Sequence, residues 1–240
     1  MPLTILIVAA LIGAAISGAI GMGGGVFLLA VMATVLPPGV VVPIHGAVQL
    51  ASNFTRSMAL LKNVSWRIFW LYTPTMVLGA WIGLQLYRGA GSWWFKPAIG
   101  AFFAAFLLWD RFKPRRIRLP LWMFVPAGIG GGFLTITVGV SGPYLAAFFL
   151  RDDLERREIV ATKATIQTLG HFLKFPAFLS LGFRYQEHWL TILPLLGCVV
   201  VGTFLGTSLL KRMPERLFGF AFRGVLLMLS LRLMASLWWN

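Results

Sequence analysis

The sequence predicts an all-α, polytopic transmembrane bundle of two inverted-topology repeats, each made of a broken-helix hairpin and three spanning helices. Three observations predict this fold. First, 58% of the 240 residues are hydrophobic and 12% are charged, whereas soluble domains average about 25% charged residues. Second, two glycine-bearing stretches, 20–25 and 139–143, interrupt apolar segments. Third, the apolar segments recur in the same order in both halves of the chain.

The first predicted element is a hairpin of two short apolar helices, 3–19 and 26–36, on either side of the glycines. A helix needs about 20 apolar residues to cross a bilayer, so neither helix is a comfortable span by itself. Glycines bring backbone close to a ligand, and the next helix begins with unpaired amide N–H groups. Such a break is tolerated in a membrane where it is buried in protein or lines a wet cavity. We therefore expect Gly23, Gly24 and Gly25 to bind a ligand, whether the hairpin is re-entrant or made of two tilted spans.

The remaining elements follow in a repeated order. The single transmembrane domain, 1–240, divides into repeat 1 at about 1–110, a cytoplasmic basic loop at 110–120, and repeat 2 at about 121–240. After a turn at 37–39, the predicted spans of repeat 1 are 43–61, 67–87 and 93–109. Repeat 2 has a second hairpin from 121–138 and 139–150, a charged loop at 151–158, and spans at 159–179, 189–210 and 217–239.

Matching residues at a constant separation support the duplication. A shift of 118 residues pairs Gly24 with Gly142 and Gln49 with Gln167. The same shift pairs Gly21–Gly139, Phe54–Phe172 and Arg56–Lys174. After a longer loop the shift becomes 123 and the pairs are Gly79–Gly202, Gly83–Gly206, Arg88–Lys211 and Phe95–Phe218.

The positive charge predicts the orientation of the repeats. The net charge of +14 lies mostly in short connections, so it reports topology rather than binding to nucleic acid. Let the N-terminus lie on side A of the membrane, and let each hairpin enter and leave by the same face. The opposite side, side B, then carries 13 basic residues, and side A carries Arg88, Lys96 and Arg184. Side B is then cytoplasmic, both termini are periplasmic, and the halves are inverted. The basic residues of side B are Lys62, Arg67, Arg111, Lys113, Arg115, Arg116, Arg118, Arg151, Arg156, Arg157, Lys211, Arg212 and Arg216.

Each repeat carries a polar stripe on the helix after its hairpin. The polar residues of each stripe are three or four positions apart, so they lie along one face of the helix. Polar groups inside a membrane bundle indicate a substrate path, and the alternative is hydrogen bonding between helices at about 0.6 kcal/mol each. Arg56 and Lys174 lie near helix ends, where snorkelling to the interface is the simpler interpretation. The stripes are His45, Gln49, Asn53 and Arg56 in repeat 1, and Lys163, Gln167, His171 and Lys174 in repeat 2.

The chemistry of these residues favours an anionic ligand. The interior candidates are neutral donors or cations, while all seven acidic residues lie in loops or at segment ends. Helix starts at the glycine breaks attract anions, and Ser141 adds a hydroxyl. Proton coupling would fall to His45 or His171, since no interior carboxylate is present. No catalytic constellation or P-loop is found, and three His and one Cys are a thin supply of metal ligands, so no enzyme, cofactor or metal site is expected.

Three stretches, 16–27, 42–53 and 161–168, resemble the sulfite exporter TauE/SafE family of bacterial membrane permeases. The similarity covers nearly the whole chain. It implies transport of small sulfur-containing anions, such as sulfite, sulfoacetate or related organosulfur acids, across the bacterial inner membrane. One departure from the internal repeat is that Ser141-Gly142-Pro143 stands where the first half has Gly23-Gly24-Gly25.

We therefore expect a secondary transporter that works by alternating access at a site between the two repeats. An anion channel and a non-transporting membrane scaffold or assembly factor stay open as alternatives. The expected partners are a small anionic solute and the lipid bilayer, with no nucleic acid, and a homodimer is left open. The expected substrate-binding residues are Gly23, Gly24, Gly25, Gln49, Asn53, Ser141, Gly142, Lys163, Gln167 and His171.

Overall fold

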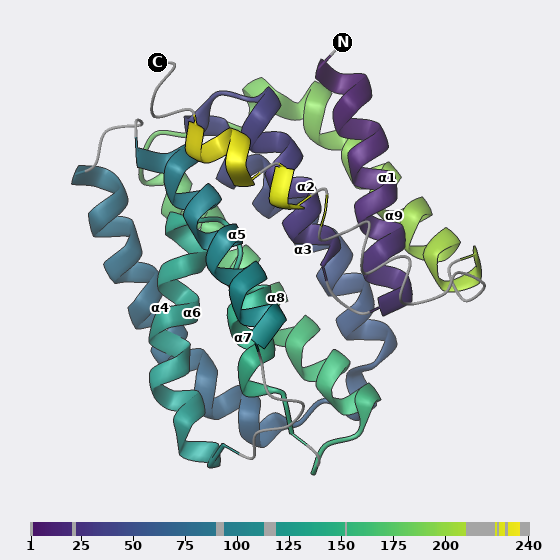
Figure 1. Ribbon diagram of the computed structural model, residues 1–240, viewed down its shortest axis with the longest axis vertical. Coiled ribbons are helices and arrows are strands. Elements are labelled where there is room, and N and C mark those ends of the chain that lie inside the picture. The colour runs from purple at the N-terminus through teal and green to yellow at the C-terminus, as the bar shows by residue number, and fades with distance from the viewer. Residues whose placement is uncertain are drawn as a thin grey trace.

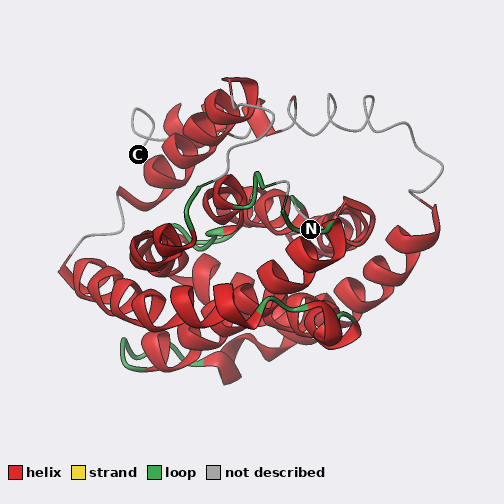
Figure 2. Ribbon diagram, turned by 90° about the horizontal axis from the view of Figure 1, so that it is seen from below, coloured by secondary structure: helices red, strands yellow, loops and turns green. Residues whose placement is uncertain are grey.

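The computed structural model describes residues 2–20, 23–89, 94–112, 119–151 and 153–209, and near the end of the chain 224, 226–228 and 230–235. Within these residues the regular elements are all helices, so the all-α prediction is confirmed (Figure 2). The α-helices are α1 (Pro2–Ile20), α2 (Gly24–Val35), α3 (Pro38–Ala59), α4 (Trp66–Gly89), α5 (Phe95–Phe112), α6 (Phe124–Thr137), α7 (Gly142–Phe148), α8 (Arg156–Leu179) and α9 (Trp189–Leu209). Short 3₁₀ turns are η1 (Leu61–Asn63), η3 (Leu121–Met123) and η4 (Tyr185–His188).

At each of the two glycine-bearing stretches one helix ends and another begins. The helices α1 and α2 meet at Gly23, and α6 and α7 meet at residues 138–141. Residues 226–228 and 230–235 are helical, within the last predicted span. Gly21, the basic residues 113–118 and the segment 210–223 lie outside the described residues.

Two helices begin earlier than the sequence predicted. Residues 37–39, expected to be a turn, form the N-cap and first positions of α3, because proline at the first helical position has a suitable φ and lacks an N–H that would be unpaired there. The helix then continues through Pro43. In the same way α8 begins at Arg156, inside the predicted charged loop, with Glu158 in its first turn, where a negative charge is favourable.

Three helix pairs dominate the packing. Figure 1 shows α4 beside α6 on one side of the molecule and α1 beside α9 on the other, and α3 packs against α8 between them. Glycines allow the backbones to approach closely. An added Cβ at Gly132 of α6 would overlap the Met76 carbonyl of α4, and one at Gly202 of α9 would lie 2.6 Å from the Leu11 carbonyl of α1. Small residues at such contacts are typical of helix packing in membranes.

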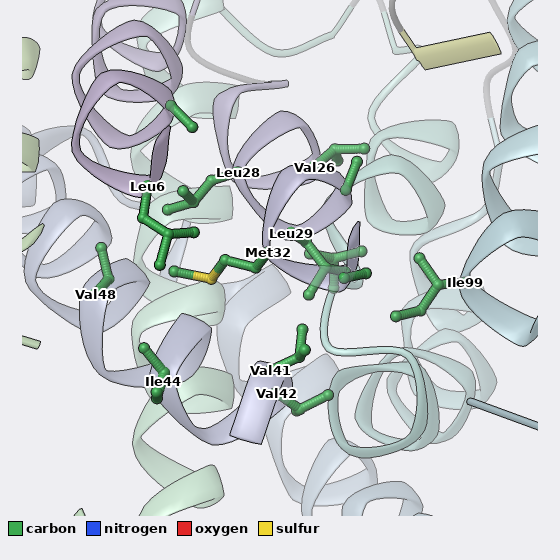
Figure 3. Packing of buried hydrophobic residues seen from close by; sticks show 14 of the residues in the cluster. Leu6, Val26, Leu28, Leu29, Met32, Val41, Val42, Ile44, Val48 and Ile99 are labelled. Atoms are coloured by element: carbon green, nitrogen blue, oxygen red, sulfur yellow. The ribbon is translucent and has the colours of Figure 1, made fainter. Parts of the chain in front are cut away.

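The main apolar core joins the first hairpin to the helix that follows it. Figure 3 shows side chains of α2, such as Leu28 and Met32, packed between Leu6 of α1 and Ile44 of α3. Leu28, Leu29 and Met32 are fully buried. The short α2 is therefore enclosed by protein, as a helix that does not span a bilayer needs to be.

By length and hydropathy, one stretch among the described residues qualifies as a membrane span, Tyr185–Leu205. The helical segments Leu3–Gly18, Gly24–Val35, Leu121–Thr137 and Leu226–Ala235 are apolar but shorter. In α3 and α8, buried polar side chains such as His45, Gln49 and Lys174 lower the mean hydropathy.

Tyr72 of α4 gives a first testable prediction. Its side chain is fully buried, and its hydroxyl, packed over Gly131 of α6, has no hydrogen-bond partner among the described residues. Removing a buried, unpaired hydroxyl is neutral or stabilising. Tyr72→Phe is therefore expected to leave the melting temperature of the purified protein unchanged or raised. A fall of several degrees would contradict this prediction by showing that the hydroxyl is satisfied.

Candidate functional site

The first hairpin tip is built around a close contact between glycines. Gly23, the N-cap of α2, has φ 95°, a backbone conformation that favours glycine. Its carbonyl accepts a hydrogen bond from the Phe27 N–H at 3.0 Å. Gly24 packs on the backbone of Gly13 in α1, with no room for a side chain on either residue. The glycines therefore have a packing role in addition to any role in binding.

Helix α3 places its polar stripe against this tip. The His45 Nε2–H donates to the Gly25 carbonyl at 2.9 Å. The Gln49 amide lies over Gly25, so closely that an added Cβ there would be 3.1 Å from Gln49 Oε1. One turn later Asn53 Nδ2 donates to the Gln49 carbonyl at 2.9 Å. These three side chains are buried, as the predicted interior stripe requires.

The second tip has the same relation to its own glutamine. Gly139 has φ 97°, and Ser141 is the N-cap of α7. The Ser141 hydroxyl lies 2.9 Å from the Thr135 hydroxyl, which donates to the Gly131 carbonyl. The Gln167 amide of α8 lies over Gly142, where an added Cβ would be 2.8 Å from Gln167 Nε2. Gln49 and Gln167 thus contact the helix that starts after each break.

The two tips are joined where α3 and α8 pack together. The rings of His45 and His171 meet edge to face with centroids 5.8 Å apart. Lys174 crosses Gly46 of α3, and its Nζ donates to the Gly139 carbonyl at 2.6 Å. Farther along the same helices the Ser57 and Thr165 hydroxyls are 2.8 Å apart.

The interpretation of Lys174 as a snorkelling side chain is wrong, because its side chain is fully buried. The sequence contained a signal for this, since Lys174 continues the helical face of Gln167 and His171 at a spacing of three residues. Near the other end of α8, Lys163 is buried as expected for an interior residue. Arg56 is half-buried in the last turn of α3.

The described helices around these side chains are poor in acids. Glu158 lies in the first turn of α8, and Asp110 lies near the end of α5. Among the described residues, no three His, Cys, Asp or Glu side chains are grouped so that they could hold a metal ion. Positive charge on His45, His171 or Lys174 would therefore be buried without a carboxylate neighbour among the described residues.

A separate groove of about 970 Å³ runs along α3 and α8. Apolar side chains such as Phe54, Phe172 and Trp189 form most of its lining. It includes none of the predicted site residues, and its apolar lining is unsuited to a small anion.

Comparison with known proteins gives one family. The family model described as Sulfite exporter TauE/SafE matches residues 5–233 of the chain. No curated protein and no solved structure matches the sequence.

Proposed function

Because the chain belongs to the sulfite exporter TauE/SafE family, a family of membrane permeases, we propose that it is a secondary transporter of small sulfur-containing anions. Sulfite, sulfoacetate and related organosulfur acids are the proposed substrates. The observation that carries the proposal is the repeated contact at the two tips, Gln49 over Gly25 and Gln167 over Gly142, made by two glutamines that are 118 positions apart.

The helix contacts support two repeats. In the proposed duplication α1 corresponds to α6, and α4 corresponds to α9. The contact of α1 with α9 is then the counterpart of the contact of α6 with α4, and both are large. The helices that carry the polar stripes, α3 and α8, pack against each other at the centre. Inverted repeats that hold the substrate where their broken helices meet are a recurring design of secondary transporters.

The proposed anion site lies between the tips. Its donors are the side-chain amides of Gln49, Gln167 and Asn53, the Ser141 hydroxyl, and the basic groups of His171 and Lys163. Backbone of Gly23, Gly24, Gly25 and Gly142 forms its walls. His45 and His171, which touch each other and the first tip, are the proposed route for a coupled proton. Rocking of one repeat against the other would open this site to each side of the membrane in turn.

The membrane placement follows from the basic connections. The α3–α4 connection lies against the start of α8, where the Ser65 N–H donates to the Thr162 hydroxyl at 2.8 Å. Lys62, Arg67, Arg156 and Arg157 therefore occur at one end of the molecule. We propose that this end faces the cytoplasm of a bacterial cell, that the chain crosses the inner membrane several times, and that both termini are periplasmic.

Uptake by proteoliposomes tests the transport proposal. Radiolabelled sulfite and sulfoacetate are supplied to vesicles containing the wild-type chain, Gln49→Ala or Gln167→Ala. Each variant loses an amide that would bind a charged ligand, worth about 1.5–3 kcal/mol, so transport is expected to fall about tenfold or more. Gln85→Ala, at an exposed position of α4, is the matched control and should transport like wild type.

The kinetics separate the alternatives. Carrier-mediated transport saturates with substrate concentration and shows exchange of internal for external anion. Flux that does not saturate would instead indicate an anion channel. Wild-type vesicles that take up no anion would favour a scaffold or assembly factor, and unchanged transport in both glutamine variants would remove these residues from the site.

A further inference from the structure

His45, His171 and Lys174 form one buried group, which we call the basic cluster. The exposed fractions of the side chains are 0%, 5% and 0%. The two rings are in contact, and Lys174 interacts electrostatically with both of them. The cluster lies between the two tips, because His45 binds the Gly25 carbonyl and Lys174 binds the Gly139 carbonyl.

Each of the two histidine rings of the basic cluster, when neutral, has one nitrogen whose lone pair can accept a proton. A carbonyl oxygen can only accept a hydrogen bond, so His45 Nε2 carries the hydrogen in its bond to Gly25. In the neutral ring the Nδ1 of His45 then has a lone pair. The Nδ1 atoms of His45 and His171 are both buried and have no hydrogen-bond partner among the described residues. A proton on either ring would give the cluster a second positive charge beside the Lys174 ammonium.

Among the residues that the structure describes, no carboxylate lies where it could balance that charge. The helices α2, α3, α4, α6, α7 and α9 contain no Asp or Glu. Glu158 on α8 is 16 residues before Lys174, about 24 Å along the helix. Glu187 of η4, which contacts α3, is exposed and paired with Arg184 at 3.2 Å. The other titratable groups on elements packed against α3 or α8 are Arg56, Lys62, Arg67, Tyr72, Tyr87, Arg88, Tyr144, Arg156, Arg157, Lys163, Tyr185, His188 and Cys198.

We propose that the basic cluster binds a dianion together with one proton. This inference rests on the transport function proposed above and names the charge of its substrate. When protonated, Lys174 supplies one positive charge, which its acceptor, the neutral Gly139 carbonyl, does not balance. The His45–His171 pair supplies a second positive charge when a ligand with two negative charges enters. Binding of anion and proton then favour each other, because each reduces the cost of burying the other's charge.

The substrate class follows from this charge balance. A small sulfur acid with two negative charges, such as sulfoacetate or the fully ionised form of sulfite, neutralises the protonated cluster. A monoanionic sulfonate is balanced by the Lys174 ammonium alone and needs no proton on the histidine pair. Proton uptake on binding should therefore depend on the charge of the ligand rather than on its size.

Titration calorimetry measures this difference on the purified full-length protein. Sulfoacetate and methanesulfonate are each titrated at one pH near neutrality in two buffers with different ionisation enthalpies, which yields the number of protons taken up. Both ligands keep constant charge near this pH, so the protons come from the protein. We expect sulfoacetate to bind with uptake of about one proton more than methanesulfonate.

Two variants locate the charges. Lys174→Met keeps an unbranched side chain without the ammonium group, so sulfoacetate binding should weaken more than tenfold, and methanesulfonate should now bind with proton uptake on the histidine pair. His171→Gln should reduce the proton uptake that accompanies sulfoacetate. Lys62→Gln, at an exposed position of η1, is the control and should behave like wild type. Thermal unfolding of each variant verifies that it is folded.

The outcomes distinguish this inference from the transport proposal. Sulfoacetate binding without proton uptake, or equal uptake with both ligands, would overturn the dianion–proton site while leaving anion transport in place. Absence of binding and of transport for every anion tested would instead contradict the proposed function itself. The wild-type measurement does not depend on the variants, so a variant that fails to fold leaves the test decisive.

Discussion

Gly132→Ala is expected to separate α6 from α4 and to destabilise the protein by about 3 kcal/mol or more, since overpacking typically costs about 1–3 kcal/mol and here the clash is with backbone. An added Cβ at Gly132 would overlap the Met76 carbonyl and would lie 2.7 Å from the Ala80 amide nitrogen, both of α4. Backbone atoms within a helix cannot move aside as the end of a flexible side chain can. The measurement is thermal unfolding in detergent, together with the yield of folded protein.

Gly197→Ala in α9 is the matched control for this prediction. No atom lies within 4 Å of a Cβ added at Gly197. Alanine is favoured over glycine in a helix interior by about 1 kcal/mol, so this variant is expected to be as stable as wild type or more stable. Equal melting temperatures for Gly132→Ala and wild type would show that the contact between α4 and α6 is looser than the structure has it.

Gly25→Ala and Gly142→Ala are expected to reduce anion transport about tenfold or more while leaving the protein folded. Each added methyl group would meet the end of a glutamine side chain, Gln49 at 3.1 Å or Gln167 at 2.8 Å. These amides can swing away, so stability should change little, but they would no longer be held over the tips. The loss of a hydrogen bond to a charged ligand, about 1.5–3 kcal/mol, corresponds to about a 10- to 100-fold effect.

Proteoliposome uptake and thermal unfolding, measured on the same preparations, test this second prediction. Gly39→Ala is its control, since no atom lies within 4 Å of the added Cβ. A variant at either tip that melts like wild type and transports at the wild-type rate would show that the glycines serve helix packing alone. A lower melting temperature with matching loss of transport would likewise favour packing.

Much of the helical arrangement could be predicted because its causes are local in the sequence. The apolar run of α2 is too short for a bilayer span, and glycines separate it from α1, so a break between two helices follows from length and composition. The spacing of His45, Gln49 and Asn53 placed them on one face of α3, and all three are buried. Helix starts were less predictable, because Pro38 and Arg156 suit a first turn as well as they suit a loop.

Lys174 shows where prediction from the sequence failed. A lysine five residues before the end of α8 is close enough to a helix end to snorkel. Its environment depends instead on two residues that are distant in the sequence. Gly46 leaves space for the lysine chain beside α3, and Gly139, with its positive φ, presents a carbonyl to the ammonium.

The sequence by itself determined the membrane class, the helical hairpins and the polar faces, since hydropathy, segment length and helical period are properties of neighbouring residues. The tertiary structure alone decided which polar faces meet. The contacts of His45 with His171, and of Lys174 with Gly139, join residues 126 and 35 positions apart. Such contacts depend on how closely α3 and α8 approach, which is set by glycines and packing from the whole bundle rather than by any local pattern.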